Sequence, residues 1–195
     1  MTGIALKIMN RVARHGRGAR VYTAAHFRDL GSEGAVWQAL SRLEKAGKLR
    51  RIARGLYDYP RHSKLLDTAV PASADAVAAA LGAVAKDDLA AANALGVTTA
   101  VSVRPAYLTA GQSRVREIGN RTIELKRAPA WLLDFRRTAA MPIVQALNWL
   151  GDDLDDDAVE KLRNSMTPNI ARALKSKRVP NRLREPIRVL TLAVT

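Results

Sequence analysis

A capped amphipathic helix near residues 32–47 constrains the fold more than any other feature of this sequence. Ser32 is a favourable N-cap residue, and Gly47 is a favourable residue for ending the helix. Between them, apolar residues recur at the spacing of one helical face, at Val36, Leu40 and Leu43. The sequence therefore predicts a helix that buries one face against neighbouring elements and exposes the other.

The segments before and after this helix are predicted to form two further helices and a pair of strands. A helix is predicted over residues 4–15 and a short second helix over residues 23–30. After the capped helix, residues 49–53 and 56–59 are predicted as two strands joined by a turn at residues 54–55. Two helices joined by a tight glycine-containing turn and followed by a basic hairpin indicate a winged helix-turn-helix.

Charge is distributed unevenly along the chain. The sequence holds 32 Lys and Arg against 18 Asp and Glu, which gives a formal net charge of +14. Residues 1–64 hold 14 basic and 4 acidic residues, residues 65–159 hold 9 and 12, and residues 160–195 hold 9 and 2. A uniform compositional bias would not concentrate positive charge at the two ends. The first third is therefore the first candidate for binding a polyanion, and the C-terminal segment is the second.

The polar face of the capped helix and the basic hairpin supply the candidate DNA-binding residues. Gln and Arg on a helix in the major groove can form paired hydrogen bonds with adenine and guanine edges, so Gln38 and Arg42 are expected to contact bases. Small residues and free N–H groups at the helix N-terminus favour close approach to phosphate. The hairpin arginines are expected to bind phosphate or to enter a minor groove. Trp37 is expected to pack between helices. The predicted set is Ser32, Gly34, Ala35, Gln38, Ser41, Arg42, Lys45, Arg50, Arg51 and Arg54.

A three-part motif lies within residues 36–60. It consists of Leu-Ser-Arg-Leu at 40–43, Gly47-Lys48-Leu49, and Arg54-Gly55-Leu56-Tyr57. This motif resembles the N-terminal winged helix of AbiEi-type antitoxins, which belong to type IV toxin–antitoxin systems linked to bacterial abortive infection. Segments further along the chain are also similar to these antitoxins, at residues 91–97, 107–109, 123–126 and 145–147.

The resemblance implies an antitoxin that binds operator DNA with inverted repeats and represses its own operon. It also implies that the C-terminal domain counteracts a nucleotidyltransferase-like toxin without needing a stable complex with it. A plain winged-helix transcriptional regulator is the close alternative, because the winged helix alone does not separate the two functions.

Composition changes between residues 60 and 72, where two prolines flank a polar stretch. We therefore predict a winged-helix domain over residues 1–64 and a C-terminal domain over residues 65–195. The expected class is α+β, with a small antiparallel sheet and a helical C-terminal part in the second domain. A helix is predicted over residues 73–85, and helices are predicted again from residue 138 onward. The predicted strands between them are 98–103, 106–109, 114–118 and 122–127.

The amino-acid types that the sequence lacks exclude several classes of protein. The chain has no cysteine, which excludes disulfide scaffolds, cysteine zinc sites and thiol catalysis, and it has only three histidines. No apolar run reaches the roughly 18 residues of a transmembrane helix. The N-terminus also lacks the apolar core of a signal peptide. We expect a cytoplasmic protein that has no membrane partner and needs no cofactor.

An enzymatic alternative is carried by Glu124-Leu125-Lys126 on a predicted strand. This triplet matches half of a magnesium-dependent nuclease site, which also requires an Asp on a preceding strand. The preceding strand offers Glu117 instead, so the sequence favours a protein that is not an enzyme. The acidic stretch at residues 152–157 is expected to cap a helix, with a metal site as its alternative.

Overall fold

The computed structural model describes residues 3–63, 65 and 67–192. It divides into two compact units, each with its own hydrophobic core. The first unit comprises Met1–Gly82 together with Arg116–Ile123, and the second comprises Ala83–Val115 together with Glu124–Thr195. Residue 64, where the predicted domain boundary falls, lies outside the described residues. The α+β class expected from the sequence is confirmed.

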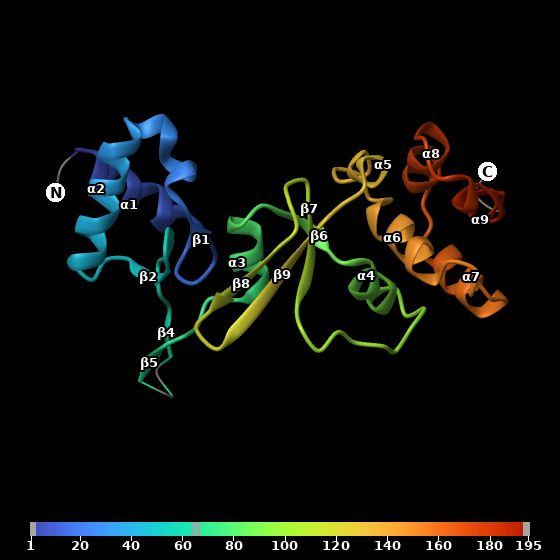
Figure 1. The fold of residues 1–195 in the computed structure, drawn as a ribbon, viewed down its shortest axis with the longest axis horizontal. Helices are drawn as coiled ribbons and strands as arrows, with labels where there is room; N and C mark the ends of the chain where they lie inside the picture. Colours follow the sequence, from blue (N-terminus) through green and yellow to red (C-terminus); the bar gives the residue numbers. More distant parts are fainter. Residues whose placement is uncertain (1–2, 64, 66, 193–195) are drawn as a thin grey trace. The chain divides into compact units, whose positions relative to one another are not determined.

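The first unit begins with helices packed on a small antiparallel sheet (Figure 1). The helical segments are α1 (Gly3–His15), the 3₁₀ helix η1 (Ala24–Leu30) and α2 (Glu33–Lys45). The sheet contains, in spatial order, β1 (Val21–Tyr22), β3 (Leu56–Asp58) and β2 (Arg50–Ala53). Ile8, Phe27 and Leu40 are fully buried between these elements. The order of helices and hairpin is the one predicted for a winged helix, with β1 as an unpredicted addition.

Local capping sets the two ends of α2. The Ser32 hydroxyl accepts a hydrogen bond from the Ala35 N–H at the first turn. At the other end, Gly47 adopts a positive φ of 65°, and its N–H donates to the Glu44 carbonyl. The following Lys48 N–H donates to the Leu43 carbonyl. Both predicted ends of this helix are therefore confirmed, and a non-glycine residue at position 47 would be strained.

The first unit continues through a short two-stranded sheet and one further helix. The sheet pairs β4 (His62–Ser63) with β5 (Thr68–Ala69), and the helix is α3 (Ala74–Ala80). The prediction of one helix over residues 73–85 is wrong. Gly82 has a φ of 90° and its N–H closes a turn on the Ala79 carbonyl, so the helix ends there. Residues 83–86 form a strand instead.

A four-stranded sheet follows, with the spatial order β6-β7-β9-β8. Its strands are β6 (Ala83–Lys86), β7 (Ala106–Thr109), β8 (Arg114–Ile118) and β9 (Arg121–Arg127). The sheet is mixed rather than wholly antiparallel as expected, because β7 and β9 run parallel. The almost wholly exposed β8 takes the edge, so β9 lies inside the sheet and buries Ile123 and Leu125. The predicted turn at Gly119 does connect β8 and β9.

Residues 98–103 do not form the predicted strand. The side-chain amide of Asn93, on α4 (Asp88–Ala94), donates to the carbonyls of Thr98 and Ala100 at 3.3 and 3.2 Å. The Thr98 hydroxyl accepts from the Ala100 N–H at 3.1 Å. Local side-chain bonds thus take backbone groups that a strand would have paired with a neighbouring strand.

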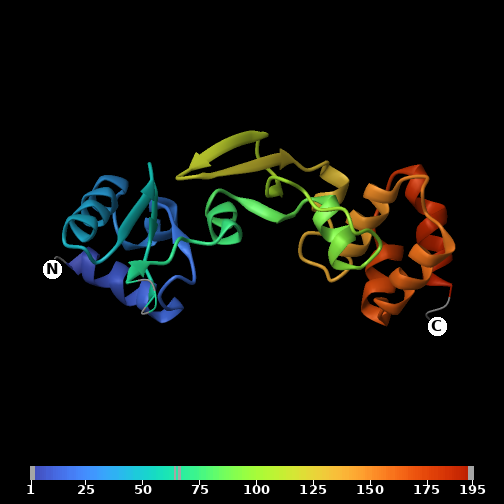
Figure 2. The ribbon, with the colours of Figure 1, turned by 90° about the horizontal axis from the view of Figure 1, so that it is seen from below.

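The second unit ends in a group of helices (Figure 2). They are α5 (Ala130–Leu133), α6 (Met141–Leu150), α7 (Asp156–Asn164), α8 (Pro168–Ser176) and α9 (Asn181–Thr191). Asp155 caps α7 by accepting from the Ala158 N–H at 2.8 Å, which confirms the capping role predicted for the acidic stretch. Along the part of the chain that the structure describes, the helices fall short of the length and apolar character needed to cross a membrane.

A polar cluster holds α4 against α6. The carboxylate of Asp88 accepts from the Asn148 amide at 2.5 Å and from the Gln145 amide at 3.2 Å. Gln145 is almost wholly buried and also donates to the Lys86 carbonyl at 2.7 Å. Burial raises the pKa of the Asp88 carboxyl, and the two amides partly offset this effect. Arg182 of α9 donates to the Asn148 side-chain oxygen, so the cluster joins three helices.

Candidate nucleic-acid interface

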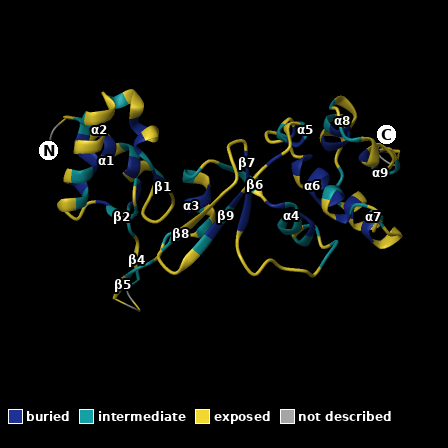
Figure 3. Cartoon of the chain, viewed as in Figure 1, coloured by how far each residue is buried: buried dark blue, intermediate teal, exposed yellow. Residues whose placement is uncertain are grey.

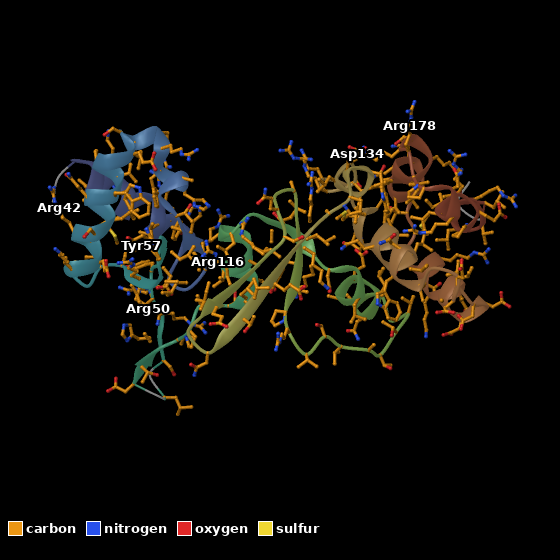
Figure 4. The ribbon with its side chains drawn as sticks, in the orientation of Figure 1. Arg42, Arg50, Tyr57, Arg116, Asp134 and Arg178 are labelled. Atoms are coloured by element: carbon orange, nitrogen blue, oxygen red, sulfur yellow. The ribbon has the colours of Figure 1, made fainter. Side chains whose placement is uncertain are left out.

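The exposed face of α2 presents one continuous polar stripe. Its residues are spaced four, three and four positions apart, so they lie along one line of the helix: Gly34, Gln38, Ser41 and Lys45. Figure 3 shows that the exposed residues of α2 lie on its outer side, away from the other elements of the unit. Arg42 flanks the stripe and projects outward from the helix (Figure 4). Seven of the ten predicted site residues lie on α2 or at its N-cap.

The N-terminus of α2 is open to an approaching ligand. Ser32 is exposed, and its hydroxyl accepts a hydrogen bond from the Ala35 N–H. A Cβ atom built at Gly34 meets nothing within 4 Å. A helix N-terminus carries partial positive charge from its unpaired N–H groups. This end of the helix therefore suits close contact with a phosphate or a base edge.

The hairpin β2–β3 forms the wing beside α2. Arg51 is exposed and lies opposite Tyr57 in the strand register, and Arg54 is exposed at the turn. Gly55 has a φ of 77°, which favours glycine at this turn. Within the part of the chain that the structure describes, neither arginine forms an ion pair or a side-chain hydrogen bond. Their guanidinium groups are therefore free to contact phosphate.

Arg50 has different surroundings from the other wing arginines. It contacts the Asp58 carboxylate through Nε at 3.0 Å and Nη2 at 2.5 Å. It also donates to the Val70 carbonyl at 2.8 Å and, at 3.4 Å, to the Ala69 carbonyl. Asp58 is only 1% exposed. These contacts hold the wing strands to the β5 segment, and DNA binding by Arg50 stays a prediction.

Trp37 packs against the wing rather than between helices as expected. A Cβ atom built at Gly55 would lie 3.5 Å from the far edge of the Trp37 ring. The indole nitrogen lies 3.5 Å from the Glu33 carboxylate on the same helix. The ring is still 40% exposed. Trp37 therefore links the start of α2 to the wing turn and leaves an apolar surface beside the polar stripe.

Other arginines of the first unit form contacts that stabilise the fold. Arg11 of α1 forms a salt bridge with Asp29 at 2.5 Å and donates to the His26 carbonyl at 2.8 Å. The Arg11 guanidinium lowers the pKa of the Asp29 carboxyl. Arg17 stacks over the Tyr59 ring at 4.2 Å from its centroid. These contacts separate structural arginines from the unpaired ones on α2 and the wing.

The sequence-based site omits Arg28 and Arg116. Arg28 is exposed on η1, and Arg116 is exposed on β8, far along the chain from the wing. Both line one hollow with Arg54 in the first unit. A sequence pattern gives no signal for this grouping, because it arises only when β8 folds beside residues of the first third.

One contact in the structure bears on the nuclease alternative. Lys126 lies 3.7 Å from the Asp87 carboxylate, so the structure does bring an Asp near the Glu124-Leu125-Lys126 triplet. Asp87 is buried, however, and caps α4 by accepting from the Ala90 N–H at 3.1 Å. Among the described residues, no group of three His, Cys, Asp or Glu side chains is placed to hold a metal ion. Capping and ion pairing account for the contacts of Asp87.

The basic C-terminal segment is divided between paired and unpaired side chains. Arg188 pairs with Glu185 at 2.6 Å, and Arg163 donates to the Val189 carbonyl at 3.3 Å. Lys175, Arg178 and Arg184 are exposed, and over the described residues they form no ion pair. Figure 4 shows Arg178 projecting from the helical part of its unit. This surface remains the second candidate for a polyanion.

Comparison with known proteins places the chain in a family. Residues 7–176 match the model of a family of unknown function, DUF6088. The chain belongs to DUF6088. It matches no curated protein and no solved structure. Membership in DUF6088 covers both the α2–wing region and most of the second unit, and it brings no activity with it. The AbiEi-type antitoxin function therefore stays a proposal.

Proposed function

We propose that this DUF6088 protein is an AbiEi-type antitoxin that binds its own operator DNA and represses its operon. The observation that carries DNA binding is the polar stripe of α2 beside a wing with two unpaired arginines. A basic face that only contacts solvent would need neither small residues at the helix N-terminus nor a neighbouring hairpin turn that carries arginines. The stripe and wing match the two elements with which a winged helix contacts DNA.

The contacts follow from the chemistry of each residue. α2 enters the major groove, where Gln38 and Arg42 reach base edges and Ser41 and Lys45 reach the adjoining backbone. The open N-terminus of the helix, with Ser32, Gly34 and Ala35, approaches a phosphate. The wing brings Arg51 and Arg54 to the neighbouring phosphates or minor groove. None of these contacts requires a cofactor.

Arg42→Ala is expected to weaken binding to the specific operator by about 1–3 kcal/mol, the usual cost of losing a base-reading arginine. Binding to an unrelated duplex should fall much less, because phosphate contacts dominate there. A mobility-shift titration on the protein's own promoter measures both affinities. Arg14→Ala, which removes an exposed arginine of α1, is the matched control. An operator affinity unchanged by Arg42→Ala would contradict the placement of α2 in the major groove.

The antitoxin part of the proposal is supported by the resemblance of the 40–57 motif and later segments to AbiEi-type proteins. Co-expression with the cognate nucleotidyltransferase-like toxin that this proposal implies is expected to restore growth that the toxin alone arrests. The control is the toxin co-expressed with an unrelated winged-helix protein. Operator binding without rescue would leave the plain transcriptional regulator as the function.

A further inference from the structure

Three arginines from separate elements surround one hollow beside the wing. The hollow has a volume of about 440 Å³ and lies among η1, the start of α2, the wing turn and β8. Its arginines are Arg28 of η1, Arg54 of the wing turn and Arg116 of β8. Trp37 and Gly55 line it as well. All of these residues belong to the first compact unit, which includes Arg116–Ile123.

The three guanidinium groups are unpaired within the part of the chain that the structure describes. Each is exposed, and among the described residues none forms an ion pair or a side-chain hydrogen bond. Two carboxylates also line the hollow, Glu33 and Glu117, and Glu33 lies against the Trp37 indole nitrogen. With three arginines against two carboxylates, the lining carries a net positive charge, and guanidinium groups that form no ion pair favour an anion that neutralises them.

We propose that this hollow holds the sugar-phosphate backbone of the DNA strand between α2 and the wing, with Arg116 as a phosphate contact. This inference rests on the proposed function. In duplex DNA, one backbone strand separates the major groove from the adjacent minor groove. A protein that places α2 in one groove and the wing in the next must accommodate that strand between them. The hollow lies at this place.

The lining of the hollow suits a backbone strand in two ways. The arginines converge on it from three elements, which matches phosphates that follow one another along a strand. The exposed part of the Trp37 ring supplies an apolar surface that suits a deoxyribose. Arg116 thereby makes β8 a third DNA-contacting element, in addition to α2 and the wing.

The test compares Arg116→Ala with Arg104→Ala over a range of KCl concentrations. Arg104 is exposed in the loop before β7, outside the first unit, and its loss changes the net charge equally. Arg116→Ala should lower operator affinity about fivefold at physiological salt and make the slope of log K against log salt shallower by about 0.9. The loss should be similar on an unrelated duplex, and Arg116→Lys should retain most of the affinity. Circular dichroism checks that each variant is folded.

The outcomes separate the two proposals. If the wild-type chain binds no duplex, the proposed function fails. If the wild type binds its operator but Arg116→Ala behaves as Arg104→Ala does, the assignment of the hollow is overturned while operator binding stands. Dependence on Arg116 for a single-stranded oligonucleotide, but not for the duplex, would also overturn the assignment.

Discussion

Arg50→Ala is expected to lower the free energy of unfolding of the first unit by about 3 kcal/mol, the scale measured when one partner of a buried ion pair is removed. The substitution leaves the Asp58 carboxylate, which is 1% exposed, without the guanidinium that contacts both of its oxygens. It also removes the donors to the carbonyls of Ala69 and Val70. Amide hydrogen exchange of the β3 residues in the full chain measures the loss, because those amides report opening of the wing.

Arg51→Ala is the matched control for this prediction. Arg51 follows Arg50 on β2 but is exposed, and it forms no ion pair among the described residues. Its loss should leave exchange at β3 unchanged and weaken DNA binding on any duplex. A variant with both Arg50→Ala and Asp58→Ala should recover part of the stability, since no carboxylate is then left buried and unpaired. If Arg50→Ala leaves β3 exchange unchanged and weakens only DNA binding, Arg50 is a DNA ligand.

Arg50 also illustrates which contacts a sequence does not specify. Three arginines in five residues, on a predicted hairpin, all qualify as phosphate ligands from their spacing. Only the tertiary structure shows that one of them contacts Asp58 and the β5 segment. The ends of α2, by contrast, were predicted correctly because Ser32 and Gly47 act on backbone groups within a few residues. Local chemistry is visible in a sequence, whereas the choice among distant partners is not.

The strands show the same difference between local and long-range signals. The Gly119 turn and the strands on either side of it were predicted from alternation and turn chemistry. The parallel pairing of β7 with β9 was missed, because alternation does not specify which strand lies beside which. The sequence predicts the β6 residues as the end of a helix, because Ala83 and Val84 fit either a helix or a strand. In the structure, Gly82 ends α3 before them. The two-residue β1 is too short to show any period.

Gly34→Glu is expected to leave the fold intact and to lower operator affinity by roughly 100-fold or more. A side chain at this position meets open space, so it creates no clash within the protein. Glutamate also has a higher helix propensity than glycine and interacts favourably with the helix N-terminus. On DNA, the same carboxylate would face the negatively charged backbone at the end of α2. Apposed like charges cost several kcal/mol, and each 1.4 kcal/mol is a tenfold change in affinity.

Ala13→Glu is the control, because it adds the same charge at an exposed position of α1. Operator affinity is measured by fluorescence anisotropy, and thermal unfolding checks stability. Near wild-type binding by Gly34→Glu would contradict the entry of the α2 N-terminus into DNA.

The Gly34→Glu variant also separates the two proposed activities. If the second unit counteracts the toxin independently of DNA, Gly34→Glu should release repression of the operon and still restore growth in the co-expression assay. Loss of both activities would show instead that neutralisation depends on the DNA-bound protein.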